Sequence, residues 1–256
     1  MPPEVRTTAL VLRTRPYGES DRLVTLLTRD HGKVTGIAKG AMRSKRRFAG
    51  TLEPFLELRA TFHHRSHSDL VFLHRCELLR PFRRFTEDLD RYVAGSYVLD
   101  LTDRMVLGRE AGAEVYELAL ETLALLDAHG RSDTLLHLFE LHLLAASGWA
   151  PELARCPSCG RDLAGMPTVY LVADRGGFLC RPCVPVGTLV RPVEGHTARA
   201  LARLAQAAPA AGRTAPPVTG EARTVLEALL AGAASGPVRS RELLHLGRIA
   251  SPHGTR

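Results

Sequence analysis

The clearest strand in the sequence reads FLELRATF, from Phe55 to Phe62. Its apolar side chains occupy every second position from Leu56 onward, and polar side chains occupy the positions between them. This period of two predicts a half-buried β-strand with its apolar residues on one face.

Four other segments among the first 85 residues alternate in the same way, with turn residues between them. They are Thr7–Arg15, Arg22–Thr28, Lys33–Lys39 and Leu70–Glu77. In the last of them, Cys76 is expected on the same face as Leu70 and Phe72, as a packed core thiol rather than a reactive one. Five short strands, with a longer link between the third and the fourth, predict a Greek-key barrel of the oligonucleotide-binding (OB) type.

After Phe85 the apolar period becomes that of helices. An acidic stripe of Glu114, Glu117 and Glu121 lies opposite apolar positions, and Thr134–Ser147 is apolar almost all round. Ser132 and Asp133 can cap this second helix, which we expect to be buried and to end at Gly148. Two further helices are expected at Thr197–Ala208 and Glu221–Ala234.

Four of the five cysteines form two pairs, CPSCG from Cys156 to Gly160 and CRPC from Cys180 to Cys183. Four thiolates from two turns make a closed tetrahedral set for one structural zinc ion, with Cys156, Cys159, Cys180 and Cys183 as the ligands. Two strands, Thr168–Ala173 and Gly177–Leu179, are expected to bring the pairs together. A redox or iron–sulfur use of the thiols is the alternative, whereas a catalytic zinc would need an open ligand position.

These patterns predict an α+β multidomain protein. An N-terminal OB-type β-barrel is expected over residues 1–80, a helical domain over 81–155, an inserted four-cysteine zinc ribbon over 156–183, and C-terminal helices that complete the helical domain over 184–256.

Charge is unevenly distributed along the chain. Residues 1–85 carry 17 basic and 8 acidic side chains, whereas residues 86–150 carry 4 and 12. A basic first third beside an acidic middle third predicts separate surfaces for separate partners, because a field of one sign attracts polyanions and repels its like.

The strongest basic cluster lies in the link after the third strand, where KGAMRSKRRF runs from Lys39 to Phe48. Crowded like charges repel one another, so an anionic partner explains them best, and nucleic acid is the predicted one. The expected backbone contacts are Lys39, Arg43, Lys45, Arg46 and Arg47, with Lys33, Arg80, Arg83 and Arg84 as a secondary set.

Two other interpretations of the cluster stay open at this point: a solvated loop, or a face that docks an acidic protein surface. Phe48 and Tyr17 suit base stacking and core packing equally. His63, His64 and His67 flank a loop, where we expect them to face solvent rather than to bind metal.

Enzyme motifs are missing from the sequence. Gly18-Glu19-Ser20-Asp21 lacks the second glycine of a nucleophile elbow, Gly32-Lys33 lacks the pattern of a phosphate loop, and His137 and His142 are off the spacing of a zinc protease. We expect a protein that is not an enzyme; a zinc-dependent hydrolase is the remote alternative.

Segments without charged residues reach only eleven residues, as from Leu141 to Pro151, too short for a membrane-spanning helix. The first residues do not form a secretion signal, and paired cysteines suit metal better than disulfides. A cytoplasmic, nucleoid-associated protein is expected.

The succession of these segments resembles the RecO family of bacterial recombination mediators. The resemblance is carried by PYGESDRLVTLLT from Pro16, by Gly32-Lys33, by AKGA from Ala38 with its basic run, by FEL from Phe139, and by GWAPEL from Gly148 into the cysteine quartet. It extends from about Thr7 to Leu246 in family order.

That resemblance implies binding of single- and double-stranded DNA and annealing of complementary strands. It also implies contact with the acidic tail of the single-stranded-DNA-binding protein, and action with RecR to load RecA. A protein-only adaptor, whose basic face docks acidic tails, is the alternative from a different functional class.

Overall fold

The computed structural model describes residues 4–44, 46–64, 70–108, 112–173, 176–188, 190–213, 220–238 and 240–247. They form two compact units, Met1–Arg131 with Val238–Arg256, and Ser132–Pro237. The four-part domain division expected from the sequence stays a prediction.

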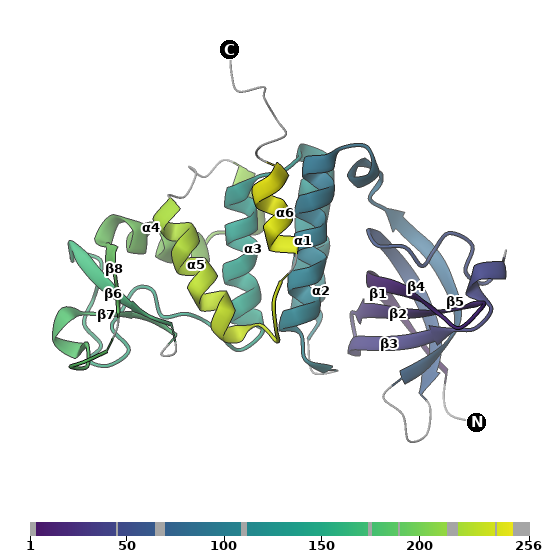
Figure 1. The fold of residues 1–256 in the computed structure, drawn as a ribbon, viewed down its shortest axis with the longest axis horizontal. Helices are drawn as coiled ribbons and strands as arrows, with labels where there is room; N and C mark the ends of the chain where they lie inside the picture. The colour runs from purple at the N-terminus through teal and green to yellow at the C-terminus, as the bar shows by residue number, and fades with distance from the viewer. Residues whose placement is uncertain are drawn as a thin grey trace, which may run out of the picture. The chain divides into compact units, whose positions relative to one another are not determined.

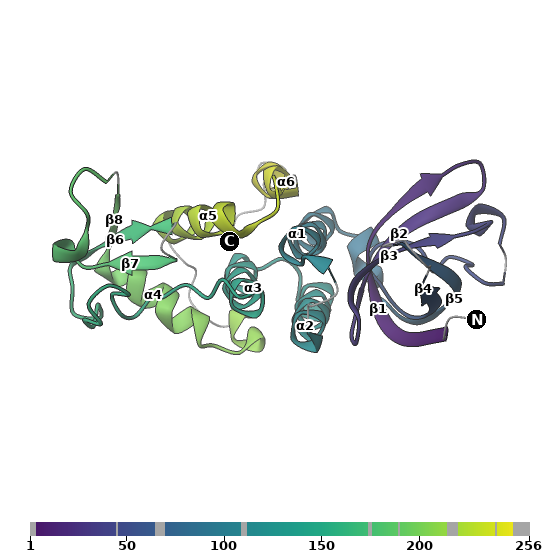
Figure 2. The same cartoon turned by 90° about the horizontal axis from the view of Figure 1, so that it is seen from below.

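All five expected N-terminal strands are present and form a closed barrel in the order β1-β2-β3-β5-β4 (Figures 1 and 2). They are β1 (Glu4–Tyr17), β2 (Asp21–Thr28), β3 (Gly32–Ala38), β4 (Leu56–His64) and β5 (Leu70–Pro81). Neighbours pair antiparallel except β3 and β5, which pair in parallel from Thr35 to Ile37. The OB-like fold expected from the alternation is confirmed.

The barrel core is built from the inward residues of the strands and from the link. Leu58, Ala60 and Phe62 of β4 are fully buried, as the alternation predicted. Phe48 and Leu52 of the link enter the same cluster and are each 3% exposed. Phe48 was expected either to stack on a base or to pack in the core, and the structure places it in the core.

A register shift in β5 corrects one expectation. Thr61 pairs with Arg75 and Phe62 pairs with Leu73, so His74 is an extra residue, or β-bulge. The bulge changes which side chains point inward: Cys76 shares the core with Val71 and Leu73, not with Leu70 and Phe72. Cys76 is a packed thiol, as predicted, but Phe72 lies outside the core cluster.

The helices of the first unit are α1 (Leu89–Met105), α2 (Ala113–His129) and α6 (Ser240–Gly247). Gly95 of α1 lies so close to two aromatic rings that a β-carbon there would come within 2.5 Å of Phe85 and 2.8 Å of Phe55. Those rings stack with their centroids 4.6 Å apart. A glycine therefore lets α1 reach the aromatic residues at the base of the barrel.

Helix α6 is held at both ends by the first unit. Its first residue, Ser240, donates from its amide and its hydroxyl to the Asp100 carboxylate at 3.1 and 2.8 Å. Near its other end, the Arg131 guanidinium donates to the Leu244 carbonyl at 3.0 Å. No helix was expected from the sequence in this segment.

The second unit begins with α3 (Asp133–Ala146), which Ser132 caps by accepting a hydrogen bond from the Leu135 amide, as predicted. It continues with a sheet in the order β7-β6-β8, namely β6 (Thr168–Val172), β7 (Gly177–Leu179) and β8 (Arg191–Glu194). It ends with α4 (Gly195–Ala205) and α5 (Gly220–Ala233). Strands β6 and β7 and all three helices were expected; β8 was not.

None of the helices in the described parts of the chain is long and apolar enough to cross a membrane.

Candidate nucleic-acid interface and metal centre

The basic link leaves β3 at Lys39 and is fixed to the barrel at several points. The Gly40 amide donates to the Asp21 carboxylate at 2.8 Å, and the Met42 amide donates to the Ser20 carbonyl at 3.0 Å. Gly40 has φ +66°, a left-handed conformation that a residue with a side chain rarely adopts. Together with buried Phe48, these contacts hold a charged segment against the barrel.

Four link cations are exposed and contact no carboxylate among the described residues: Lys39, Arg43, Arg46 and Arg47. Arg47 donates to the Lys39 carbonyl at 2.8 Å, and its guanidinium lies 5.1 Å from the centre of the Phe48 ring. These contacts orient the side chain without neutralising its charge. Lys45, the fifth predicted contact, lies outside the described residues.

Most cations of the secondary set form ion pairs or hydrogen bonds within the protein. The Lys33 ammonium lies 3.2 Å from an Asp103 carboxylate oxygen, and its side chain is only 19% exposed. Arg80 pairs with Glu57 at 3.4 Å, and Arg84 donates to the Ala128 carbonyl at 2.8 Å.

Arg83 is the one member of the secondary set whose side chain has no described polar partner. The link cations thus face solvent, whereas Lys33 joins β3 to α1 through Asp103, Arg80 pairs with Glu57 of the neighbouring strand β4, and Arg84 bonds the end of α2.

The histidines at the end of β4 do not simply face solvent. His63 Nδ1 lies 2.7 Å from His74 Nε2, and the His63 ring stacks on Phe72 with centroids 5.4 Å apart. His64 packs edge-on against buried Phe62, and His67 lies outside the described residues. The sequence offered no signal for the first arrangement, since it depends on the bulge at His74.

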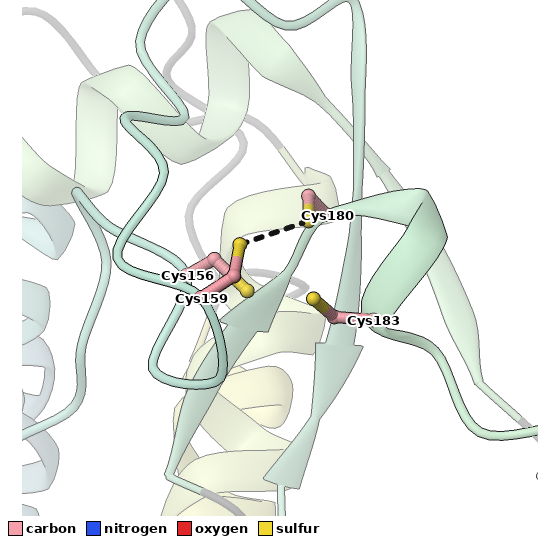
Figure 3. Close-up of side chains that lie close together, drawn as sticks. All are labelled: Cys156, Cys159, Cys180 and Cys183. Atoms are coloured by element: carbon pink, nitrogen blue, oxygen red, sulfur yellow. Dashed lines mark hydrogen bonds between the residues drawn. The ribbon is translucent and has the colours of Figure 1, made fainter.

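The four predicted metal ligands converge. Figure 3 shows Cys156 and Cys159 from one turn facing Cys180 and Cys183 from the other, and all four sulfur atoms lie within 4.8 Å of one another. Sulfurs around a tetrahedral zinc ion lie about 3.8 Å apart, given a bond of about 2.3 Å. The donor set and its spacing fit a metal ion held by thiolates.

The backbone shapes each turn for this purpose. Gly160 has φ +71°, a left-handed conformation that suits glycine, and its amide donates to the Cys156 carbonyl at 2.8 Å. The Cys183 amide donates to the Cys180 carbonyl at 3.0 Å. Each pair of thiols therefore lies on a tight turn closed by its own backbone.

The electrostatics of the quartet favour a cation. Burial opposes the ionisation of Cys156, but backbone amides near its sulfur, those of Cys180 and Cys159 among them, outweigh burial and lower its pKa to about 6. Burial, followed by the neighbouring sulfurs, raises the pKa of Cys180 to about 12. Without a metal, one thiolate suppresses the ionisation of the others, and a bound cation removes that repulsion.

Two family models match most of the chain. The family model described as "Recombination protein O N terminal" matches residues 1–82, and "Recombination protein O C terminal" matches residues 86–242.

Similar proteins named DNA repair protein RecO come from several bacteria. The protein of Anaeromyxobacter sp. (strain Fw109-5) is 42% identical over 234 residues, 90% of this chain and 91% of the relative. That of Syntrophus aciditrophicus (strain SB) is 34% identical over 77% of this chain and 76% of its own length. That of Myxococcus xanthus (strain DK1622) is 41% identical over 68% and 70%.

With both family models matched in order on a barrel, a helical part and a cysteine quartet, the chain belongs to the RecO family of DNA repair proteins.

Proposed function

We propose that this DNA repair protein binds single- and double-stranded DNA through the basic link, anneals complementary strands, and acts with RecR to load RecA onto DNA coated by single-stranded-DNA-binding protein. One observation carries the proposal: Lys39, Arg43, Arg46 and Arg47 project from the barrel as exposed cations without carboxylate partners among the described residues. A protein in the bacterial cytoplasm, without hydrolytic activity of its own, suits this role.

Electrostatics explain how such a segment promotes annealing. Two single strands repel each other through their phosphates, and cations that neutralise some of this charge lower the cost of bringing the strands together. Backbone contacts carry no sequence information, so the bases stay free to pair with each other. Annealing by this route needs no nucleotide hydrolysis.

The cysteine quartet supports a structural role for zinc in the same protein. Cys156, Cys159, Cys180 and Cys183 would hold the ion, and four thiolates leave no position for water or substrate. Bound zinc supplies a cross-link between the two turns and no chemistry at a substrate.

The interface is tested by reversing charge at Arg43, Arg46 and Arg47 together. Binding of labelled oligonucleotides of any sequence should weaken, and the slope of log affinity against log salt should flatten by about 1 for each lost phosphate contact. Fluorescence anisotropy between about 50 and 200 mM salt measures both quantities.

The matched control reverses charge at Arg155, Arg161 and Arg191, three exposed arginines of the second unit. It changes the net charge equally and should leave the slope nearly unaltered. Unchanged affinity and slope in the link variant would contradict the proposed interface.

Strand annealing tests the wider function. The purified protein is mixed with complementary strands, alone and with RecR and the single-stranded-DNA-binding protein, in the absence of nucleotide. A labelled acidic-tail peptide, run in parallel with labelled DNA, separates the mediator from a protein-only adaptor, which would bind the peptide alone.

A further inference from the structure

An unusual cluster lies at the point where the link leaves the barrel wall. It consists of Lys39, His63, Phe72 and His74, from the end of β3 and from β4 and β5. The Lys39 ammonium lies 5.6 Å from the centre of the Phe72 ring, and the His63 ring stacks on the same residue. One half-buried aromatic side chain thus positions a permanent cation and an imidazole.

The two imidazoles share one hydrogen bond. His63 Nδ1 and His74 Nε2 are 2.7 Å apart, so one nitrogen donates and the other accepts. If both rings are protonated, both nitrogens become donors and two cations face each other at this distance. An anionic oxygen that accepts from both rings removes that conflict, because it replaces the lost acceptor and neutralises the charge.

Lys39, on the β3 side, favours an anion at this place. Arg75, which follows His74 on β5, pairs with the Glu77 carboxylate at 3.2 Å and so contributes less. Glu4 is opposite His63 in the β1–β4 register, but no carboxylate among the described residues bonds either imidazole. The remaining β4 histidine, His64, packs against Phe62 of the core.

We propose that His63 and His74, with Lys39, form a proton-linked phosphate-binding subsite that extends the DNA interface from the link onto the barrel wall. The inference rests on the proposed DNA binding and adds a dependence on pH. A DNA phosphate binds best to the doubly protonated pair, so binding takes up a proton. Affinity then rises as pH falls, by up to about tenfold per pH unit where the pair titrates.

The test measures binding of labelled oligo-dT to the full chain from about pH 5.5 to about pH 8.5 at constant ionic strength, the range in which histidines change charge. Thymine keeps its protonation state over this range, so the readout reports on the protein. The wild type should bind more tightly at low pH, and His63→Gln with His74→Gln should flatten that dependence. Glutamine preserves hydrogen bonding but carries no titrating charge.

His129→Gln is the control, since His129 is exposed at the end of α2 and away from the link in the sequence. It should retain the pH dependence of the wild type. Circular dichroism of each variant at each pH shows that the fold persists.

Several outcomes overturn the inference. A double variant that binds DNA with the pH dependence of the wild type removes the subsite and leaves the link intact as the interface. A histidine-dependent response to a poly-glutamate peptide, but not to DNA, assigns the cluster to a protein partner instead. If the wild type binds no DNA at any pH, the proposed function is overturned as well.

Discussion

Single side chains decide how closely the parts of the first unit approach each other. Gly95 is the sharpest case, because the rings of Phe55 and Phe85 occupy the space where a β-carbon would lie. Phe55 itself has φ +63°, a strained conformation held by the packing of its ring and by a hydrogen bond from the Phe82 amide to its carbonyl at 3.1 Å. The junction between barrel and α1 therefore depends on a glycine that the helical period alone does not explain.

We expect Gly95→Ala to destabilise the protein by about 1–3 kcal/mol, as overpacking of a close-packed site does. The measurement is the midpoint of urea unfolding. Gly232→Ala in α5 is the matched control: nothing lies within 4 Å of the position its methyl group would take, so the change should be neutral or slightly stabilising. If Gly95→Ala were as stable as the wild type, the rings of Phe55 and Phe85 would be able to move aside without cost, which would contradict the prediction.

Cys76 provides a second test at this scale. Burial raises the pKa of its thiol to about 12, so the thiol stays protonated and shielded in the folded protein. Because the folded protein holds this thiol protonated, the stability linked to its protonation is fully present below the ordinary pKa of 9.0 and is lost as pH rises through about 12. At about pH 8, a chromogenic thiol reagent should modify exposed Cys159 and half-buried Cys183 of the metal-free native protein before Cys76. Reaction of Cys76 at the rate of Cys159 would contradict its burial.

At the scale of elements, the two cysteine turns depend on each other. The strands β6 and β7 pair from Tyr170 to Val172 and bring the turns together, although β7 has only three residues. A metal cross-link would then supply much of the stability of this segment.

Cys183→Ser should lower the zinc content well below one ion per chain and make the segment from Cys156 to Cys183 sensitive to protease. Elemental analysis and limited proteolysis measure the two effects. Cys76→Val keeps all four predicted ligands and should retain the metal. Full zinc occupancy in the Cys183 variant would exclude a four-thiolate site.

The sequence predicted elements wherever a period was long and regular. The five strands, α3 and the paired cysteines are of this kind, because alternation, capping residues and ligand spacing are local properties. The inward face of β5 was predicted wrongly because one inserted residue, His74, reverses the alternation, and a bulge depends on the partner strand. The contact between His63 and His74 could not be predicted from the sequence for the same reason.

For the candidate interface, the sequence located the cations but not their partners. Lys33 and Lys39 lie at the two ends of one expected strand, yet Asp103 of α1 pairs with Lys33 and not with Lys39. That difference arises from packing between residues far apart in the chain, which charge counts along the sequence do not contain.

For the molecule as a whole, the chain leaves the first unit after Arg131 and returns to it at Val238. The return depends on Asp100, whose carboxylate accepts both hydrogen bonds from Ser240 and also pairs with Arg104 at 3.4 Å. Asp100→Ala should cost about 1 kcal/mol or more, as loss of a capping carboxylate does.

Hydrogen exchange checks this prediction. Residues 240–247 should lose protection in the Asp100 variant, while β1 to β5 keep theirs. Glu114→Ala, which removes an exposed carboxylate from the first turn of α2, is the comparison. Unaltered exchange in α6 would show that the helix docks without its cap.

Because the second unit is connected at both ends to one and the same folded body, a single peptide-bond cleavage inside it should not release either piece. The fragments would stay associated through α1 and α6 until denaturant separates them. By the same topology, a stop codon shortly before Val238 would remove a helix from the amino-terminal body rather than trim a dispensable end.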